Sequence, residues 1–593
     1  MHLRSLAPWA LAAGALASFG VAPVRAAQAV EAQAPDPAVD RILATLSLHD
    51  RAAQLVMPWL PGTYASADDP SGATVRRWVD SLHVGGLIVS VGSPLDIAAR
   101  LNRLQRRSRL PLLIASDLEE GTARRLAGGT AFPTNMGVAA GGRESDAYAM
   151  GRVTAEEGRA VGIRLAFAPV ADVNSNPDNP IINVRSFGAD PRAVARFVSA
   201  EVRGMQEHGV LATVKHFPGH GDTDINSHLS LPVIHADWAR LDSLELVPFR
   251  AAIAAGAAGV MSAHIAVPAL DGGRTEPGTI DPGMLTGVLR DSLGFRGLVV
   301  TDALDMAGLV RGWGADDAPV LALMAGADLL LQPADPDGAV DAIVRAVRDG
   351  RITRARLDRS VRRVLAMKHR AGLFRHRTVP LDGVSRAVGS AEHLAVASGV
   401  ATRSIVLLDD GAGALDSLRS APRRVALVAY GEEPQIPVGH ALAAGLRDAG
   451  DTVALFRLWP ASGPASYDSA RALLGGAGTA LFAVAVRAIA GNARVAIPDA
   501  LAALINATAR SRATVLLSLG SPYIIRQTPA VGTYLIAWSA NPISETAAAR
   551  ALSGAAIGGR LPISIPPAFP LGAGLDRPET RRGGTPTLTS ERR

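Results

Sequence analysis

Residues 213–228, TVKHFPGHGDTDINSH, gather side chains that can transfer protons or bind ligands. His216 and His220 are four residues apart, a spacing that places two imidazoles on one face of a helix as metal ligands. Pro218 and Gly219 lie between them and disfavour that helix. The glycine spacing also differs from a phosphate-binding P-loop, and no Lys-Ser/Thr pair follows it. Acid–base chemistry and a solvated surface loop therefore remain the two leading interpretations.

Lysine usage favours a functional role for this segment. Among the 60 basic residues of the chain, only Lys215 and Lys368 are lysines. A sequence so biased toward arginine retains a lysine where a compact ammonium is needed in place of a planar guanidinium.

Other polar side chains follow short apolar runs elsewhere in the first two thirds of the chain. These runs lie at 84–90, 111–117, 163–173, 210–216, 259–265, 297–304 and 327–332. Continuous apolar runs bounded by Gly or Pro are typical of strands buried on both faces. The polar residues at or near their ends are Asp117, Asp172, Lys215, His216, His264 and Asp302.

The order of elements predicts the fold class. Helical patterns such as 236–256 separate the apolar runs, so the chain reads as alternating β and α units. This order predicts an α/β fold, with a TIM-like (β/α)8 barrel as the leading choice. In such a barrel the carboxyl ends of the strands build the active site, so the polar residues would converge. A doubly wound sheet would gather them only at a switch point.

We expect four segments along the chain. Arg4, the apolar stretch after it and the small residues of Val24-Arg25-Ala26 are typical of a cleaved secretory signal peptide that is too short to span a membrane. After residue 383 the strand and helix pattern restarts, which predicts a second, smaller α/β sandwich domain. The segments are a signal peptide at 1–26, the barrel at 40–375, the sandwich at 390–570 and a polar, frayed tail at 571–593.

Composition narrows the functional classes. The chain has no cysteine, which excludes disulfides, thiolate metal sites, a cysteine nucleophile and a lipidated N-terminal cysteine. Its 60 basic and 54 acidic residues are interspersed, which argues against a nucleic-acid partner. After the signal peptide no uninterrupted apolar stretch reaches membrane-spanning length, so we expect no stable membrane insertion after cleavage. The prediction is a periplasmic or secreted protein.

The segment 214–234, VKHFPGHGDTDINSHLSLPVI, resembles a signature of family 3 glycoside hydrolases, in particular of their β-N-acetylglucosaminidase (NagZ-like) branch. Three further segments, 116–126, 167–188 and 290–306, are similar to other motifs of that family and occur in the same order. The resemblance covers about residues 40–375, and the region at 390–570 looks like the C-terminal α/β sandwich that many members carry.

This resemblance implies a retaining exo-β-N-acetylglucosaminidase. Such an enzyme removes terminal, non-reducing β-linked N-acetylglucosamine from peptidoglycan fragments or chitin-type oligosaccharides, and it needs a nucleophile and an acid/base. The motif match implies Asp302 as nucleophile and His228 as acid/base, since imidazole both donates and accepts protons near neutrality. A helix N-cap is the structural alternative for Asp302, and Asp305 is the less favoured nucleophile. No metal or organic cofactor is implied.

The sequence departs from the family pattern at Asn226, where the family has an aspartate two residues before the acid/base histidine. Asn226 can still accept a bond from the His228 ring, but it carries no charge to stabilise the imidazolium. Either Asp222 or Asp224 substitutes for the missing charge, or the enzyme is slower. On this interpretation Asn226→Asp raises the rate for leaving groups that need protonation.

The same match implies a carbohydrate-binding set, in which Asp117 accepts bonds from sugar hydroxyls and cationic or imidazole groups donate them. Its members are Asp117, Arg125, Arg185, Lys215 and His216. His264 corresponds to a rim position or is a satisfied core histidine. Three functional alternatives stay open: a family 3 β-glucosidase, a phosphorylase-like transferase, and an inactive sugar-binding protein that lost turnover through Asn226.

Overall fold

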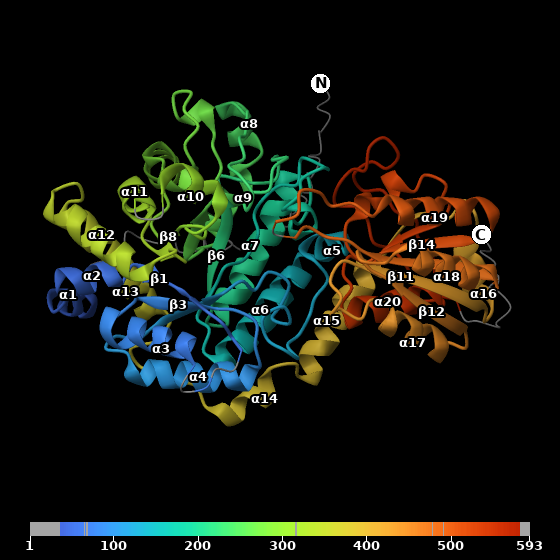
Figure 1. Cartoon of the computed structure of the whole chain (residues 1–593), viewed down its shortest axis with the longest axis horizontal. Coiled ribbons are helices and arrows are strands. Elements are labelled where there is room, and N and C mark those ends of the chain that lie inside the picture. The colour runs from blue at the N-terminus through green and yellow to red at the C-terminus, as the bar shows by residue number, and fades with distance from the viewer. Residues whose placement is uncertain are drawn as a thin grey trace, which may run out of the picture.

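The computed structural model describes residues 36–580, apart from 64–65, 67–68, 315–316, 477 and 490. The predicted signal peptide, 1–26, lies outside the described residues. The chain folds into two domains that lie side by side (Figure 1). The larger one is coloured blue to yellow and the smaller, C-terminal one orange to red, and helix α15 (Ala391–Ser404) lies between them.

The first domain is a parallel β-barrel, as predicted. Seven strands pair in sequence order: β2 (Trp59–Leu60), β3 (Gly86–Val89), β4 (Leu113–Ser116), β5 (Leu165–Ala166), β6 (Leu211–Phe217), β7 (Gly259–Ser262) and β8 (Leu298–Val300). The segment just before β2, β1 (Val56–Met57), pairs with β9 (Leu330–Leu331). A bridge between Val300 and Leu329 joins β8 to the start of β9, so the parallel sheet closes on itself.

Helices surround this barrel and bury their apolar sides against it. They are α1 (Pro37–Ala44), α2 (Leu48–Ala53), α3 (Pro70–Arg77), η1 (Trp78–Leu82), α4 (Pro94–Arg107), α5 (Asn135–Ala140), α6 (Glu144–Val161), α7 (Pro191–Glu207), α8 (Trp238–Ser243), α9 (Leu246–Ala254), η5 (Gly283–Ser292), α10 (Ala307–Trp313), α11 (Ala318–Ala325), α12 (Pro336–Arg348), α13 (Arg354–Arg370) and α14 (Val384–Ala387). The single helix expected at 236–256 is two helices, α8 and α9. Pro248 explains the division, because a proline lacks an N–H and is tolerated in the first turn of a helix but not in its interior.

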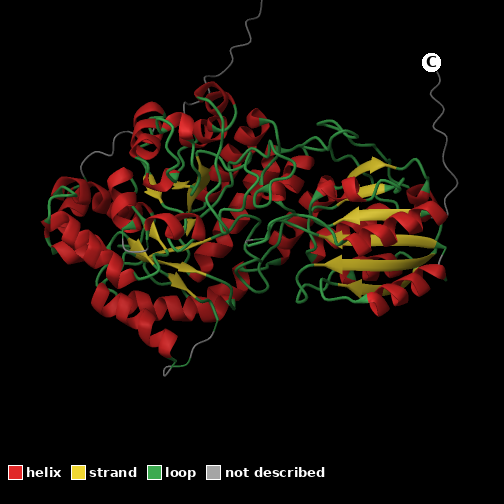
Figure 2. Ribbon diagram, turned by 45° about the horizontal axis from the view of Figure 1, so that its top comes forward, coloured by secondary structure: helices red, strands yellow, loops and turns green. Residues whose placement is uncertain are grey.

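The C-terminal domain is a three-layer α/β sandwich (Figure 2). Its sheet has the order β10 (Val406–Asp409), β15 (Tyr534–Ile536), β14 (Thr514–Ser518), β13 (Thr479–Ala485), β11 (Arg424–Gly431) and β12 (Thr452–Leu458). All neighbours are parallel except β10 and β15. One face packs on α18 (Pro464–Gly475) and α19 (Asp499–Ser511), the other on α16 (Ala414–Ser420), α17 (His440–Asp448) and α20 (Pro542–Leu552).

The two domains meet above the carboxyl ends of the barrel strands. Trp538 of the C-terminal domain is fully buried against α5, where a Cβ on Gly137 would lie 2.7 Å from its side chain. Asn174, in the loop after β5, donates from Nδ2 to the hydroxyl of Tyr523 at 3.0 Å. The C-terminal domain therefore rests on the loops that follow the strands, where a barrel places its active site.

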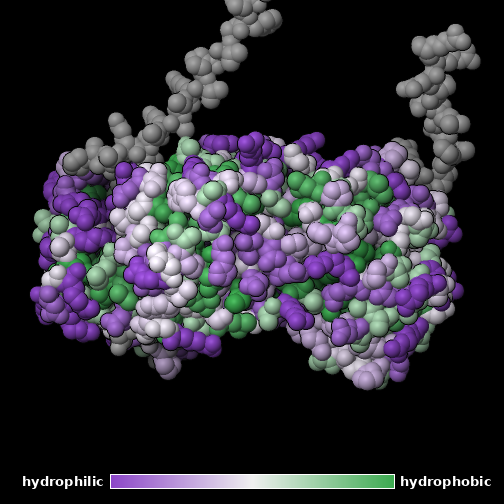
Figure 3. Space-filling model, turned by 90° about the horizontal axis from the view of Figure 1, so that it is seen from above, coloured by the Kyte–Doolittle hydropathy of each residue, from purple (hydrophilic) through white to green (hydrophobic). Residues whose placement is uncertain are grey.

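The chain beyond residue 570 partly contradicts the predicted frayed tail. The backbone N–H of Leu575 donates to Leu407, and that of Thr580 donates to Gly554, so 571–580 pack on the C-terminal domain. Residues 581–593 lie outside the described part. No helix in the described part is long and apolar enough to span a membrane. Figure 3 shows hydrophilic and hydrophobic residues interspersed over both domains on one face.

Candidate active site

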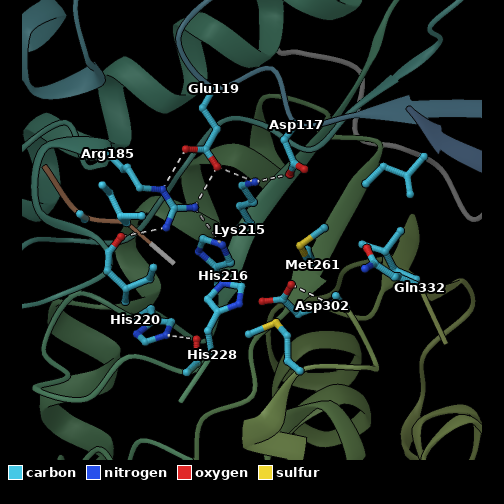
Figure 4. Close-up of a pocket in the computed structure, with 18 of the residues that line it drawn as sticks. Asp117, Glu119, Arg185, Lys215, His216, His220, His228, Met261, Asp302 and Gln332 are labelled. Atoms are coloured by element: carbon cyan, nitrogen blue, oxygen red, sulfur yellow. Dashed lines mark hydrogen bonds and ion pairs between the residues drawn. The ribbon is translucent and has the colours of Figure 1, made fainter. Parts of the chain in front are cut away.

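A cavity of about 720 Å³ opens at the carboxyl end of the barrel (Figure 4). Seven residues singled out from the sequence line it: Asp117, Arg125, Arg185, Lys215, His216, His228 and Asp302. Asn226 is buried beside it. Arg487, Ala488 and Ile489 of the C-terminal domain form part of its wall, a contribution that the sequence did not indicate. Both domains therefore build this cavity.

A buried ion-pair cluster forms one wall of the cavity (Figure 4). The Lys215 Nζ, at the end of β6, lies 2.9 Å from Asp117 Oδ1 and 2.7 Å from Glu119 Oε1. Burial opposes the charged form of Lys215, but the carboxylates of Asp117 and Glu119 outweigh it and raise its pKa. Conversely, Arg185 and Lys215 hold the pKa of Glu119 well below its usual value against the effect of burial. The cluster therefore presents fixed charges to the cavity, which bind sugar hydroxyls more strongly than neutral groups do.

Glu119 is the member of this cluster that sequence reasoning missed. Arg185 donates to it twice, from Nη2 at 2.8 Å and from Nε at 2.9 Å. Arg125 contacts Asp117 more loosely, at 3.3 Å. Glu119 follows Asp117 by two residues in the same loop after β4, so a survey of every acidic residue after a predicted strand would have included it.

His216 is oriented by a buried carboxylate. Its Nδ1 lies 2.7 Å from Oδ2 of Asp172, a fully buried residue that also accepts the backbone N–H of His220 at 2.7 Å. Burial opposes ionisation of Asp172, but His216 outweighs it and lowers its pKa. An ionised carboxylate only accepts, so the Nδ1 of His216 donates. The other ring nitrogen, Nε2, lies 3.5 Å from Arg185 Nη2, and His216 lines the cavity, so its role in donating to the sugar stays a prediction.

His220 stabilises the loop through hydrogen bonds of both ring nitrogens and is not placed as a metal ligand. Its Nδ1 lies 2.7 Å from the hydroxyl of Thr223 and its Nε2 lies 3.0 Å from that of Ser227. Burial lowers its pKa to about 4, so the ring is neutral near neutral pH. Within residues 36–580, where described, no three His, Asp or Glu side chains converge as a metal site.

Asp302 lines the cavity, two residues after the end of β8. Its Oδ1 accepts the backbone N–H of Ala303 at 2.8 Å. Burial raises its pKa, but the neighbouring imidazoles of His216 and His264 and this N–H bond outweigh burial, so the net pKa is lowered. Helix α10 begins at Ala307, so Asp302 is not its N-cap. An ionised, half-buried carboxylate that faces a cavity is a competent nucleophile.

Two neighbours of Asp302 have structural roles. His264 is fully buried and donates from Nε2 to the carbonyl of Ala303 at 2.9 Å, so the structure favours the satisfied core histidine over the rim position. Asp305 accepts a bond from Gln332 Nε2 at 2.9 Å. The loop that carries Asp302 is thereby tied to two adjacent elements.

His228 faces the same cavity, but its environment differs from the prediction. Burial lowers its pKa below the usual histidine value, and the opposing effect of Asp302 is smaller. Among the described residues none forms a hydrogen bond with its ring. Asn226 accepts the backbone N–H of His228 at 3.0 Å, and among the described residues it forms no hydrogen bond with the imidazole, in place of the ring bond that the sequence allows.

Neither candidate aspartate replaces the missing charge. Asp222 pairs with Arg240 at 3.0 Å and accepts a bond from Ser175 at 3.2 Å. Asp224 is exposed and lies outside the cavity lining. Among the described residues, Asp302 is the carboxylate whose charge most opposes the lowering of the His228 pKa.

Comparisons with known proteins agree with this geometry. The family model described as the glycosyl hydrolase family 3 N-terminal domain matches residues 47–367. The chain is 33% identical over 520 residues to a β-N-acetylglucosaminidase/β-glucosidase of Cellulomonas fimi, covering 83% of this chain and 90% of that protein. It is 38% identical over 298 residues to β-hexosaminidase A of Pseudoalteromonas piscicida, covering 48% of this chain and 49% of that protein.

Solved structures resemble both domains together. A family 3 β-N-acetylglucosaminidase from Paenibacillus sp. superposes with a TM-score of 0.79 at 33% identity, covering 88% of this chain and 99% of that one. The β-glucoside phosphorylase BglX, bound to 2FGlc, superposes with a TM-score of 0.79 at 27% identity, covering 89% of this chain and 96% of that one.

Proposed function

Because the chain belongs to glycoside hydrolase family 3, we propose that it is an exported, retaining exo-β-N-acetylglucosaminidase. The observation that carries the proposal is the cavity in which Asp302 and His228 face a buried cluster of charged groups. Relatives named β-N-acetylglucosaminidase or β-hexosaminidase support the sugar. The signal-peptide pattern at 1–26 supports export, and with it substrates such as peptidoglycan fragments or chitin-type oligosaccharides.

The mechanism has two displacement steps. In the first, a carboxylate oxygen of Asp302 attacks the anomeric carbon while His228 donates a proton to the departing glycosidic oxygen, which leaves a covalent glycosyl-enzyme. In the second, His228 takes a proton from water, and the resulting hydroxide oxygen attacks the anomeric carbon and releases Asp302. The configuration at this carbon inverts twice and is retained.

The binding cluster holds the sugar during both steps. Asp117 accepts bonds from sugar hydroxyls, and the cationic and imidazole groups donate to them, namely Lys215, Arg185, Arg125 and His216. The charges are matched before substrate arrives, so no group has to reorganise its protonation on binding. Preorganised polar groups of this kind stabilise a transition state most effectively.

The test compares p-nitrophenol release from the β-N-acetylglucosaminide and from the β-glucoside, using wild type and Asp302→Ala. We expect release from the first substrate and a loss of about 10⁴-fold or more in the variant, since a nucleophile has been removed. Equal activity of the folded variant contradicts the role of Asp302. A preference for the glucoside supports the β-glucosidase alternative. If the folded wild type releases p-nitrophenol from neither substrate, the result supports the sugar-binding protein.

Phosphorolysis is the second candidate. A neutral His228 without a carboxylate partner does not repel an anionic acceptor, and a solved relative is named a β-glucoside phosphorylase. If phosphate replaces water in the second step, added phosphate converts the glycosyl-enzyme to a sugar 1-phosphate. Mass spectrometry of the products with and without phosphate separates the two reactions.

A further inference from the structure

Asn226 links the loop that carries His228 to the C-terminal domain. Its side chain is 1% exposed, and its Nδ2 donates to two backbone carbonyls of that domain, Ile489 at 3.2 Å and Asn492 at 3.0 Å. Its Oδ1 accepts the backbone N–H of His228. We propose that Asn226 is a positioning residue through which the C-terminal domain sets the place of the acid/base. This inference rests on the role of His228 in the proposed function.

The chemistry of the contact selects an amide. Carbonyl oxygens accept hydrogen bonds and cannot donate them, so a partner that faces two of them must supply two donors. The amide of Asn226 has two N–H groups and uses both. An aspartate has the same shape but no donor, and it would place a negative charge against two carbonyl oxygens.

The segment whose carbonyls accept these bonds is held in place inside the C-terminal domain. Its residues Arg487, Ala488 and Ile489 line the cavity. Arg487 pairs with Glu433 at 3.0 Å through Nε, and its backbone N–H donates to Glu432 at 3.2 Å. Both glutamates directly follow strand β11. Contacts therefore run from the central sheet of this domain through Arg487, Ile489 and Asn492 to Asn226 and the acid/base loop.

The barrel holds the same loop from the other side. Ser227 bonds the ring of His220, which in turn bonds Thr223, and both contacts are buried. Residue 226 is thus fixed by one domain and residue 227 by the other, while the neighbouring side chain of His228 stays free to face the cavity. An isolated barrel lacks the first of these two attachments.

This arrangement reverses the effect expected from the sequence for Asn226→Asp. The substitution removes both interdomain bonds, moves the loop and misplaces the proton donor, so it does not rebuild a charged dyad.

Asn506→Asp is the matched control. Asn506 also donates to a backbone carbonyl, that of Gln527, and accepts the backbone N–H of Ala530. Both of its bonds lie within the C-terminal domain, and Asn506 is outside the cavity lining.

The kinetic test measures kcat/KM on N-acetylglucosaminides whose leaving groups differ in basicity. We expect Asn226→Asp to lose about 10- to 100-fold on the phenyl glycoside, which needs protonation. On the 2,4-dinitrophenyl glycoside, which needs none, we expect it to stay within about threefold of wild type, and Asn506→Asp to match wild type on both. A loss of equal size on both substrates indicates a merely structural role and overturns the proposal, as does an equal or higher rate of Asn226→Asp on the phenyl glycoside.

Hydrogen exchange gives a readout that does not depend on turnover. We expect Asn226→Asp to speed amide exchange in 220–230 and 487–493 together, and Asn506→Asp to leave both segments unchanged. Unchanged exchange in the first variant overturns the link between the domains. A wild-type enzyme that releases nothing from any glycoside refutes the proposed function instead, and exchange still decides whether the domains are coupled through Asn226.

Discussion

Replacing Glu119 by glutamine tests the ion-pair cluster that forms the sugar wall. The carboxylate of Glu119 lies 2.7 Å from Lys215 Nζ and 2.8 Å from Arg185 Nη2, and the three side chains are 15%, 3% and 19% exposed respectively. Glu119→Gln keeps the shape but removes the charge that both cations share. The two neighbouring cations then keep Asp117 and the more distant Asp172 to compensate them.

The expected cost follows from these distances. Each contact contributes about 6 kcal/mol of Coulomb energy at an effective dielectric constant of about 20, most of which offsets the desolvation of the charges. Breaking a buried pair by removing one partner costs about 3–5 kcal/mol, because the remaining charge is uncompensated. We therefore expect Glu119→Gln to lower the free energy of unfolding by about 3 kcal/mol.

Activity should fall as well. A hydrogen bond from a charged donor contributes about 1.5–3 kcal/mol, so misplacing Lys215 or Arg185 lowers kcat/KM by about 10- to 100-fold. Urea unfolding and kcat/KM on the p-nitrophenyl glycoside measure the two effects.

Glu120→Gln is the matched control for this substitution. Glu120 is the adjacent residue, and its contact with Arg124 is long, at 3.7 Å, with that arginine 42% exposed. Glu120 itself is 9% exposed, but its partner is exposed and the contact is long, so we expect the pair to contribute about 0–1 kcal/mol. The reasoning is refuted if Glu119→Gln unfolds at the wild-type urea concentration with wild-type kcat/KM, or if both variants lose the same amount.

Two further predictions concern protonation and packing. For leaving groups that need protonation, kcat/KM requires Asp302 ionised and His228 protonated. Since the pKa values of both groups are lowered, kcat/KM should peak in the acidic range and fall about tenfold per pH unit as the pH rises above the His228 pKa. A pH profile that stays flat to pH 8 on the phenyl glycoside contradicts this. Gly137→Ala places a methyl group 2.7 Å from buried Trp538, so it should destabilise the domain interface by about 2 kcal/mol, and an unchanged urea midpoint argues against this packing.

The barrel was predictable because its signals are local. Apolar runs that end in polar residues specify buried parallel strands, and the closed ring then brings their carboxyl ends together. Asp117 and Asp302 follow β4 and β8, Lys215 and His216 lie at the end of β6, and the structure places all four around one cavity. Their convergence follows from the topology, so side-chain detail was not needed to foresee it.

The contacts across the domain boundary were not predictable, because no local pattern encodes them. Ile489 and Asn492 bind Asn226 through backbone carbonyls, which every residue type possesses, so their identities carry no signal. The division of 236–256 into two helices could have been foreseen, since Pro248 cannot occupy a helix interior. Glu119 was missed because its neighbour Asp117 already satisfied the pattern sought.

The loop between β6 and α8 carries both the acid/base histidine and the residue that bonds the C-terminal domain. A charged residue at position 226 would stabilise an imidazolium, whereas the asparagine found there uses both of its donors on the other domain. As a result, His228 holds its proton less firmly, because burial lowers its pKa more than the charge of Asp302 raises it. The position of the acid/base in turn depends on both domains, since residue 226 bonds the C-terminal domain and residue 227 bonds the barrel. A neutral imidazole is well suited to accept a proton in the second step, so the first step, protonation of the leaving oxygen, is the one that this sequence makes sensitive to pH and to the leaving group.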